Sequence, residues 1–340
     1  MFGKATSFFI VGLCCGVLSA TLAFALVLRS ADDAHEPGGS PTRVLKLAHS
    51  LDEKHPVHQA LLQMAETLDQ KSRGRLSLEI FANSQLGSEA ECVEQLQQGA
   101  LDLTKTSAGP LENFIPEIAV LGVPYVFRSE DHCWKVLEGP IGDELLAAGE
   151  RVGFKGLCYF DAGARSFYTV NRAILSPDDL VGLKIRVQQS KTAMAMVEAL
   201  GGSPTPIDWG ELYSALQTNQ VDGAENNLPS FYSNRHFEVC RHFTRNEHTR
   251  VPDVLLVSEQ TWQALSPDEQ RWLQEAAYES ADRQRQLWSD ETKRVLQALE
   301  AEGVAVHVPD LAPFIEKVQD LHHSYDGTQV GGLMQRIAEE

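Results

Sequence analysis

The chain has 340 residues, a net charge of −18 with histidine neutral, and an apolar content of 43%. This length fits two domains or one large two-lobed domain. The acidic charge is spread along the chain, which disfavours nucleic acid as a partner and favours solubility. A body of this charge needs a local positive pocket to bind an anion, so buried arginines are of particular interest.

The first 30 residues form a segment of their own, with an apolar run from about Phe8 to Leu28 that follows Lys4. The run is long enough to span a bilayer, and residues 23–25 offer a small-residue cleavage site. Two alternatives stay open: residues 1–30 are a cleaved signal peptide or an uncleaved N-terminal anchor. Both predict that the body is exported, tethered to the inner membrane in the second case. Residues 31–43 lack periodicity and predict a flexible tether.

The first part of the body alternates strands with helices. Strands are predicted at residues 44–48, 76–81 and 101–105, and helices at 56–73 and 89–96. This βαβαβ order predicts a parallel sheet whose ligand crevice lies at the carboxyl ends of the strands. Four polar residues fall at such ends, namely His49, Ser50, Lys105 and Ser107.

The second part contains two hinge candidates and one long helix. The small residues 162–164 follow a strand at 152–160, and a second hinge candidate lies at 248–253. A proline-rich loop at 203–206 precedes Trp209. Ser266 and Glu269 form a capping box around a first-turn proline. Nothing breaks the helix from there to Glu302, so we expect about 37 residues that run across both lobes.

The sequence offers little for catalysis or metal binding. No HExxH, GxSxG or CxxC motif and no phosphate-binding glycine loop is present. Asp52 and Glu53 could be drawn with His55 and His58 as a metal site, but a solvated helix start explains the spacing better. The body contains four cysteines without zinc-site spacing, which we expect as buried free thiols with at most one disulfide. We therefore predict no enzyme, no cofactor and no metal.

Two arginines lie among apolar residues in strands. Arg186 stands between Ile185 and Val187, and Arg165 follows the first hinge candidate. A buried guanidinium needs a partner, because an unpaired buried charge costs several kcal/mol. That partner is either an internal carboxylate, the ordinary case for one arginine, or the carboxylate of a ligand. Two arginines that converge on a crevice at strand ends favour an anionic ligand.

Seven ordered motifs make the chain from Val44 to Phe314 resemble the periplasmic solute-binding proteins of tripartite ATP-independent periplasmic (TRAP) transporters. The motifs are Asn83-Ser84-Gln85-Leu86-Gly87, Gly99-Ala100-Leu101-Asp102, Val123-Pro124-Tyr125, Gly182-Leu183-Lys184-Ile185-Arg186-Val187, Ser203-Pro204-Thr205-Pro206, Glu211-Leu212-Tyr213-Ser214-Ala215-Leu216-Gln217 and Val221-Asp222-Gly223-Ala224-Glu225-Asn226. The one small departure is Val123, where the family often has leucine.

The resemblance implies an α/β periplasmic binding protein fold with two lobes, two mixed sheets flanked by helices, hinge strands and one long lobe-spanning helix. The expected boundaries are 44–163 with 252–291 for lobe I, and 164–251 with 292–340 for lobe II. Arg186 matches the arginine that binds the ligand carboxylate in a bidentate manner, and Arg165 matches a second ligand-facing arginine. The other expected ligand contacts are Asn226, Trp209 as an aromatic wall, Glu225, Lys105, His49, and a selectivity set of Glu89, Ser107 and Ser50.

The function implied by the resemblance is that of a receptor which delivers a small acid to membrane-embedded TRAP permease subunits. Ser107 stands where sialic-acid binders of the family carry an acid, which disfavours that ligand. Lys105, Glu89 and His49 favour a compact polyhydroxylated acid such as glucuronate or galacturonate. We expect a monomer that does not bind nucleic acid. The alternatives are a ligand-sensing protein on the same scaffold and a uronate-processing enzyme.

Overall fold

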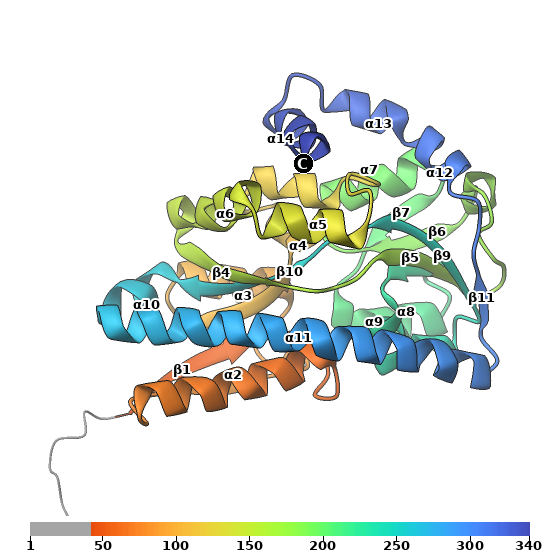
Figure 1. The fold of residues 1–340 in the computed structure, drawn as a ribbon. Helices are drawn as coiled ribbons and strands as arrows, with labels where there is room; N and C mark the ends of the chain where they lie inside the picture. The colour runs from red at the N-terminus through yellow and green to blue at the C-terminus, as the bar shows by residue number, and fades with distance from the viewer. Residues whose placement is uncertain (1–41) are drawn as a thin grey trace, which may run out of the picture. The chain divides into compact units, whose positions relative to one another are not determined.

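The computed structural model describes residues 42–340, which build two mixed β-sheets flanked by helices (Figure 1). The predicted export segment and nearly all of the predicted tether lie outside the described residues. No helix within 42–340 combines the length and the apolar character needed to cross a bilayer.

The first sheet has the strand order β2-β1-β3-β10-β4. β3 pairs parallel with β1, whereas β10 enters antiparallel between β3 and β4. The strands are β1 (Arg43–Ala48), β2 (Leu76–Phe81), β3 (Leu103–Ser107), β4 (Phe154–Phe160) and β10 (Asp253–Ser258). The associated helices are α2 (Pro56–Ser72), α3 (Glu89–Gln97), α4 (Ala108–Leu111), α5 (Glu130–Leu137), α6 (Pro140–Ala147) and α10 (Glu259–Ala264), with short 3₁₀ helices η1 (Pro116–Gly122) and η2 (Ala148–Val152).

The second sheet has the order β11-β9-β5-β8-β6-β7. Its strands are β5 (Arg165–Thr169), β6 (Lys184–Val187), β7 (Ser203–Pro206), β8 (Gly223–Asn226), β9 (His242–Thr249) and β11 (Ala305–His307). Its helices are α7 (Lys191–Ala199), α8 (Leu212–Gln217), α9 (Leu228–Ser233), α12 (Ala312–Lys317) and α13 (Gln319–Ser324), with η3 (Pro177–Leu180), η4 (Trp209–Glu211) and η5 (His236–Glu238). The chain passes between the sheets at residues 161–164 and 250–252, where the hinges were predicted.

Helix α11 (Pro267–Ala301) serves both sheets, as the sequence predicted (Figure 1). Its 35 residues span about 53 Å. The capping box is formed, with the Ser266 backbone N–H donating to Glu269 Oε2 at 2.8 Å. Leu273 lies in the core of the first sheet, and Leu299 lies in the core of the second. One rigid helix therefore joins the two hydrophobic cores.

The side chain of Gln284 in α11 binds the backbone of the first crossover between the sheets. The Asp161 N–H donates to Gln284 Oε1, and Gln284 Nε2 donates to the Asp161 carbonyl oxygen, both at 2.8 Å. Asp161 also accepts a 2.7 Å hydrogen bond from the Gly163 N–H through Oδ1. Gly163 itself has φ +59°, a conformation that glycine adopts at little cost.

Two sequence expectations need correction. Residues 203–206 form β7 rather than a loop, and β7 pairs parallel with β6 at the edge of the sheet, where proline is tolerated in a strand. The strand expected at 101–105 runs from Leu103 to Ser107. Asp102 lies in the preceding loop, where its carboxylate accepts hydrogen bonds from the Lys46 N–H and from Thr261 Oγ1.

The C-terminal helices contact both cores. Phe314 of α12 lies in the core of the second sheet, whereas Leu333 and Ile337 of α14 (Gln329–Glu339) lie in the core of the first. The expected boundaries assign all of 292–340 to lobe II. This assignment of the C-terminal segment to one lobe remains a prediction. Cys92, Cys133, Cys158 and Cys240 are buried free thiols, as predicted.

We expect Gly163→Ala to destabilise the protein more than the matched variant Gly303→Ala. Both glycines have positive φ, +59° and +72°, so both alanines carry the left-handed backbone cost of about 1–2 kcal/mol. Only the Cβ at 163 meets a neighbour, Trp288 Nε1, at 2.9 Å. Urea unfolding of the two variants checks this. Equal losses would show that Trp288 does not restrict the hinge.

We expect Asp161→Asn to stabilise the protein at pH 7 by roughly 2–3 kcal/mol. Burial raises the pKa of Asp161 to about 6 from its usual 3.8, because the charged form is poorly solvated there. The folded state therefore holds a proton that the unfolded state has lost between pH 3.8 and 6, and wild-type stability falls as pH rises through that window. Asparagine keeps the Oδ1 acceptor for Gly163. Urea unfolding at pH 7 and at pH 4 should show the gain shrinking toward zero at the lower pH; a gain independent of pH would contradict the assignment.

Candidate ligand-binding site

A cavity of about 40 Å³ lies between the two sheets, beside the carboxyl ends of β3, β6 and β8. It is lined by residues from β3, β10 and the loop after β1 on one wall, and from β5, β6, β8 and α9 on the other. A wider mouth of about 210 Å³ shares lining residues with it, among them Ser50, Glu89, Arg186 and Trp209.

Arg186 lines the cavity without an acid partner among the described residues. The residue is 3% exposed, and its Nε donates to the Ile207 carbonyl oxygen at 2.8 Å. Its NH1 nitrogen is buried and has no hydrogen-bond partner in the described part of the chain. Burial lowers the pKa of Arg186, since the charge is desolvated without a paired carboxylate. The guanidinium therefore offers a buried donor to the cavity.

Arg165 lines the same cavity, but its guanidinium is occupied from within the protein. Nε and NH2 bind the two carboxylate oxygens of Glu225 at 2.5 and 2.7 Å, and NH1 donates to Asn226 Oδ1 at 2.9 Å. Burial alone would raise the pKa of Glu225, but Arg165 and a hydrogen bond from His248 outweigh it and hold that pKa at about 2. The two arginines are therefore unequal: Arg165 is paired internally, and Arg186 is open.

Trp209 contributes a second buried donor near Arg186. Its Nε1 is buried and has no hydrogen-bond partner among the described residues. The centroid of its ring lies 5.8 Å from Cζ of Arg186 and 5.1 Å from the centroid of the tilted His236 ring. Asn226 also lines the cavity; its Oδ1 is used by Arg165 and by the Asn227 N–H. This end of the cavity thus presents hydrogen-bond donors.

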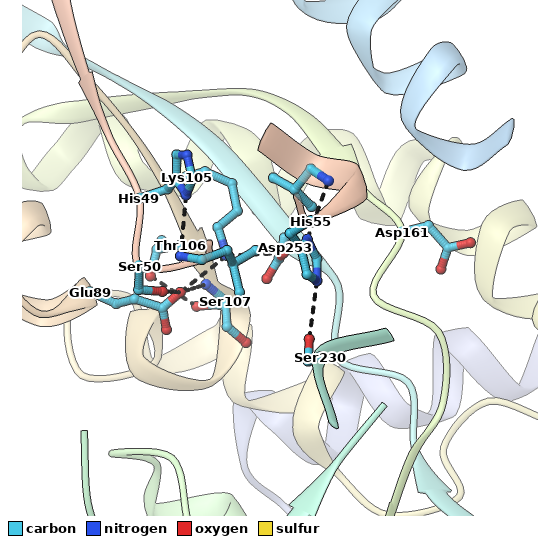
Figure 2. Close-up of polar contacts among 12 residues, drawn as sticks. His49, Ser50, His55, Glu89, Lys105, Thr106, Ser107, Asp161, Ser230 and Asp253 are labelled. Carbon is cyan, nitrogen blue, oxygen red and sulfur yellow. Dashed lines mark hydrogen bonds and ion pairs between the residues drawn. The ribbon is translucent and has the colours of Figure 1, made fainter. Parts of the chain in front are cut away.

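The first-sheet wall of the cavity is built around Glu89, on which three donors converge (Figure 2). Its Oε1 accepts from Lys105 Nζ and the Ser107 N–H at 3.2 Å and from Ser50 Oγ at 3.3 Å. Lys105 also donates to Asp253 Oδ2 at 3.0 Å. Burial alone would lower the pKa of Lys105, but Asp253 and Glu89 outweigh it and raise that pKa, so the lysine stays charged.

The two walls of the cavity already touch. Ser107 Oγ donates to Gln188 Oε1 at 3.3 Å, and Asn113 Nδ2 donates to the Gln189 carbonyl oxygen at 2.7 Å. Deeper in the cleft, His55 Nε2 lies 3.2 Å from Ser230 Oγ (Figure 2). These bonds join the wall of the first sheet to that of the second, so the structure represents a cleft with its walls in contact.

Two expected ligand contacts lie outside the lining of the cavity. His49 is buried against His58, with Nε2 2.9 Å from Nδ1 of that ring, and burial lowers the pKa of His49 to about 3. Glu225 lies behind Arg165, to which it is paired. Both residues support the site from behind its surface in this structure.

Several lining residues were missed by sequence reasoning, namely His55, Gln188, Asn227, Ser230, Asp253 and Trp288. Gln188 could have been predicted as a lining residue, because it lies two residues after Arg186 and so on the same side of an extended segment. Asp253 could not, because only the insertion of β10 beside β3 brings it to Lys105. Within residues 42–340, no group of three His, Cys, Asp or Glu side chains is placed to hold a metal ion.

The family model described as "Bacterial extracellular solute-binding protein, family 7" matches residues 47–328. A solute-binding protein of Chromohalobacter salexigens is 33% identical over 272 residues, which is 80% of this chain and 81% of that protein.

Two solved structures share the fold along most of the chain. A TRAP periplasmic solute-binding protein from Bradyrhizobium sp. BTAi1 in complex with α/β-D-galacturonate is 41% identical with a TM-score of 0.85, and the match covers 88% of this chain and 100% of that one. The corresponding protein from Pseudomonas putida F1 with bound D-glucuronate is 34% identical with a TM-score of 0.84, covering 87% and 97%. These similarities confirm the two-lobed α/β fold. The chain belongs to bacterial extracellular solute-binding protein family 7, the TRAP solute-binding proteins that its motifs predicted.

Proposed function

We propose that this protein is a periplasmic receptor that binds a hexuronic acid such as D-galacturonate or D-glucuronate and delivers it to a TRAP permease in the membrane. The observation that carries the proposal is the buried Arg186 guanidinium, which faces a cavity without an internal acid. A carboxylate is the group that best matches a guanidinium in geometry and charge. Solved relatives 41% and 34% identical hold galacturonate and glucuronate, which supports this class of acid.

The ligand lies in the proposed complex with its carboxylate at Arg186 and its hydroxyl groups toward Glu89, Lys105 and Ser50. Trp209 Nε1 supplies a further donor at the carboxylate end, and Asn226 lies beside Arg165 in the same wall. The ligand favours the form with the walls in contact, because only that form surrounds it from both sheets. We propose that this form is what a membrane permease recognises, and that the receptor acts as a monomer.

One arrangement bears on the enzymatic alternative. His55 and Ser230 face each other at 3.2 Å, as a base and a nucleophile would. However, His55 Nδ1 accepts a hydrogen bond from the Val57 N–H at 3.3 Å, so the ring proton of neutral His55 lies on Nε2. Nε2 then donates to Ser230 and cannot take its proton. This hydrogen bond supports a structural contact across the cleft and a receptor rather than a hydrolase.

We expect Arg186→Met and Arg165→Met to differ in both stability and binding. Arg165→Met leaves the buried carboxylate of Glu225 unpaired and should cost about 3–5 kcal/mol of stability. Arg186→Met removes a charge that has no acid partner in the described chain, so it should cost far less, while weakening uronate binding about a hundredfold or more.

Urea unfolding without ligand and calorimetric titration with D-galacturonate and D-glucuronate measure the two effects. A normal uronate affinity in Arg186→Met would overturn the assignment of the carboxylate site. Failure of the wild-type protein to bind either acid would overturn the proposed class of ligand.

A further inference from the structure

The charged side chains that line the cavity differ between its two walls: Arg165 and Arg186 on the second-sheet wall form its positive end, and Glu89, Asp253 and Lys105 on the first-sheet wall form its far end. Arg186 is the one lining cation of the described chain without an acid partner at ion-pair distance. Arg165 also lines the cavity, but its charge is matched by that of Glu225. His55 adds no charge, because burial lowers its pKa well below its usual value. The positive end therefore has room for one carboxylate.

The far end holds two acids and one cation. Lys105 is placed between two acids, Glu89 at 3.2 Å and Asp253 at 3.0 Å. Glu89 uses only Oε1 in its hydrogen bonds, and Asp253 uses only Oδ2. The remaining oxygens, Oε2 and Oδ1, have no partner in the described chain although both residues line the cavity. These oxygens can accept hydrogen bonds from hydroxyl groups, whereas a carboxylate there would be repelled.

The charged side chains at the mouth of the cavity are also mostly acidic. Besides Glu89, its lining includes Glu91, Asp208 and Glu211, whereas Arg186 is its one cationic side chain. Each additional negative charge on a ligand therefore meets repulsion both along the entrance and at the far end.

We propose, building on the uronate receptor function above, that Glu89 and Asp253 select sugar acids with a single carboxylate and reject the corresponding dicarboxylates. Discrimination of this kind arises from a repulsive element built into the site rather than from a stronger attraction to the preferred ligand. The acids are thus specificity-determining residues, and the hydroxyl groups of the accepted ligand satisfy their unused oxygens.

The test compares D-galacturonate with galactarate, which carries a second carboxylate at C1, by calorimetric titration of four proteins. These are the wild type, Glu89→Gln, Asp253→Asn and the control Glu198→Gln, an exposed acid on α7 away from the cavity. Gln and Asn keep an oxygen that can accept from Lys105. Galactarate is open-chain whereas galacturonate is largely cyclic, and this shape difference acts equally in all four proteins. It therefore cancels when the ratio of the two dissociation constants is compared between proteins.

We expect galactarate to bind the wild type at least about tenfold more weakly than galacturonate, and each cavity variant to reduce that ratio by about tenfold. The control should keep the wild-type ratio. Equal affinities in the wild type, or a ratio unchanged by both cavity variants, would overturn the inference while leaving the uronate function intact. Loss of all uronate binding in the wild type would instead overturn the function on which the inference rests.

Discussion

The unmatched charge of Arg186 is the constraint on which the site depends. A guanidinium that is 3% exposed and lacks an acid partner in the described chain carries a desolvation cost. The carboxylate of the proposed ligand would relieve that cost. Arg165 shows the opposite solution in the neighbouring strand, because Glu225 neutralises it permanently. One arginine fixes the architecture of the wall, and the other remains open to a ligand.

The fold holds these groups on two separate sheets joined by short crossovers and one long helix. Gln284 of α11 binds both the N–H and the carbonyl oxygen of Asp161, which anchors the first crossover to the long helix. Leu273 and Leu299 of the same helix lie in different cores. Short crossovers, one of which contains Gly163, and one helix shared by both cores are therefore the links between the two walls.

Much of this could be predicted from the sequence wherever the signal was local. The capping box at Ser266 and the unbroken helical stretch after it predicted α11. The apolar neighbours of Arg186 predicted that this residue lies in a buried strand. The pairing of Arg165 with Glu225 could not be predicted, because it depends on the register of β5 against β8, where Phe167 lies opposite Glu225. Asp253 was missed for a similar reason, since β10 joins the first sheet from far along the chain. The prolines of 203–206 suggested a loop. Proline is tolerated in an edge strand, but only the strand order shows that residues 203–206 lie at the edge of the sheet.

The most direct test of the central claim is a crystal structure of the protein with D-galacturonate bound. The account predicts that the uronate carboxylate lies within hydrogen-bond distance, about 2.7–2.9 Å, of Arg186 NH1, while Arg165 keeps both contacts to Glu225. A carboxylate bound instead by Lys105, or by an Arg165 that has released Glu225, would contradict it.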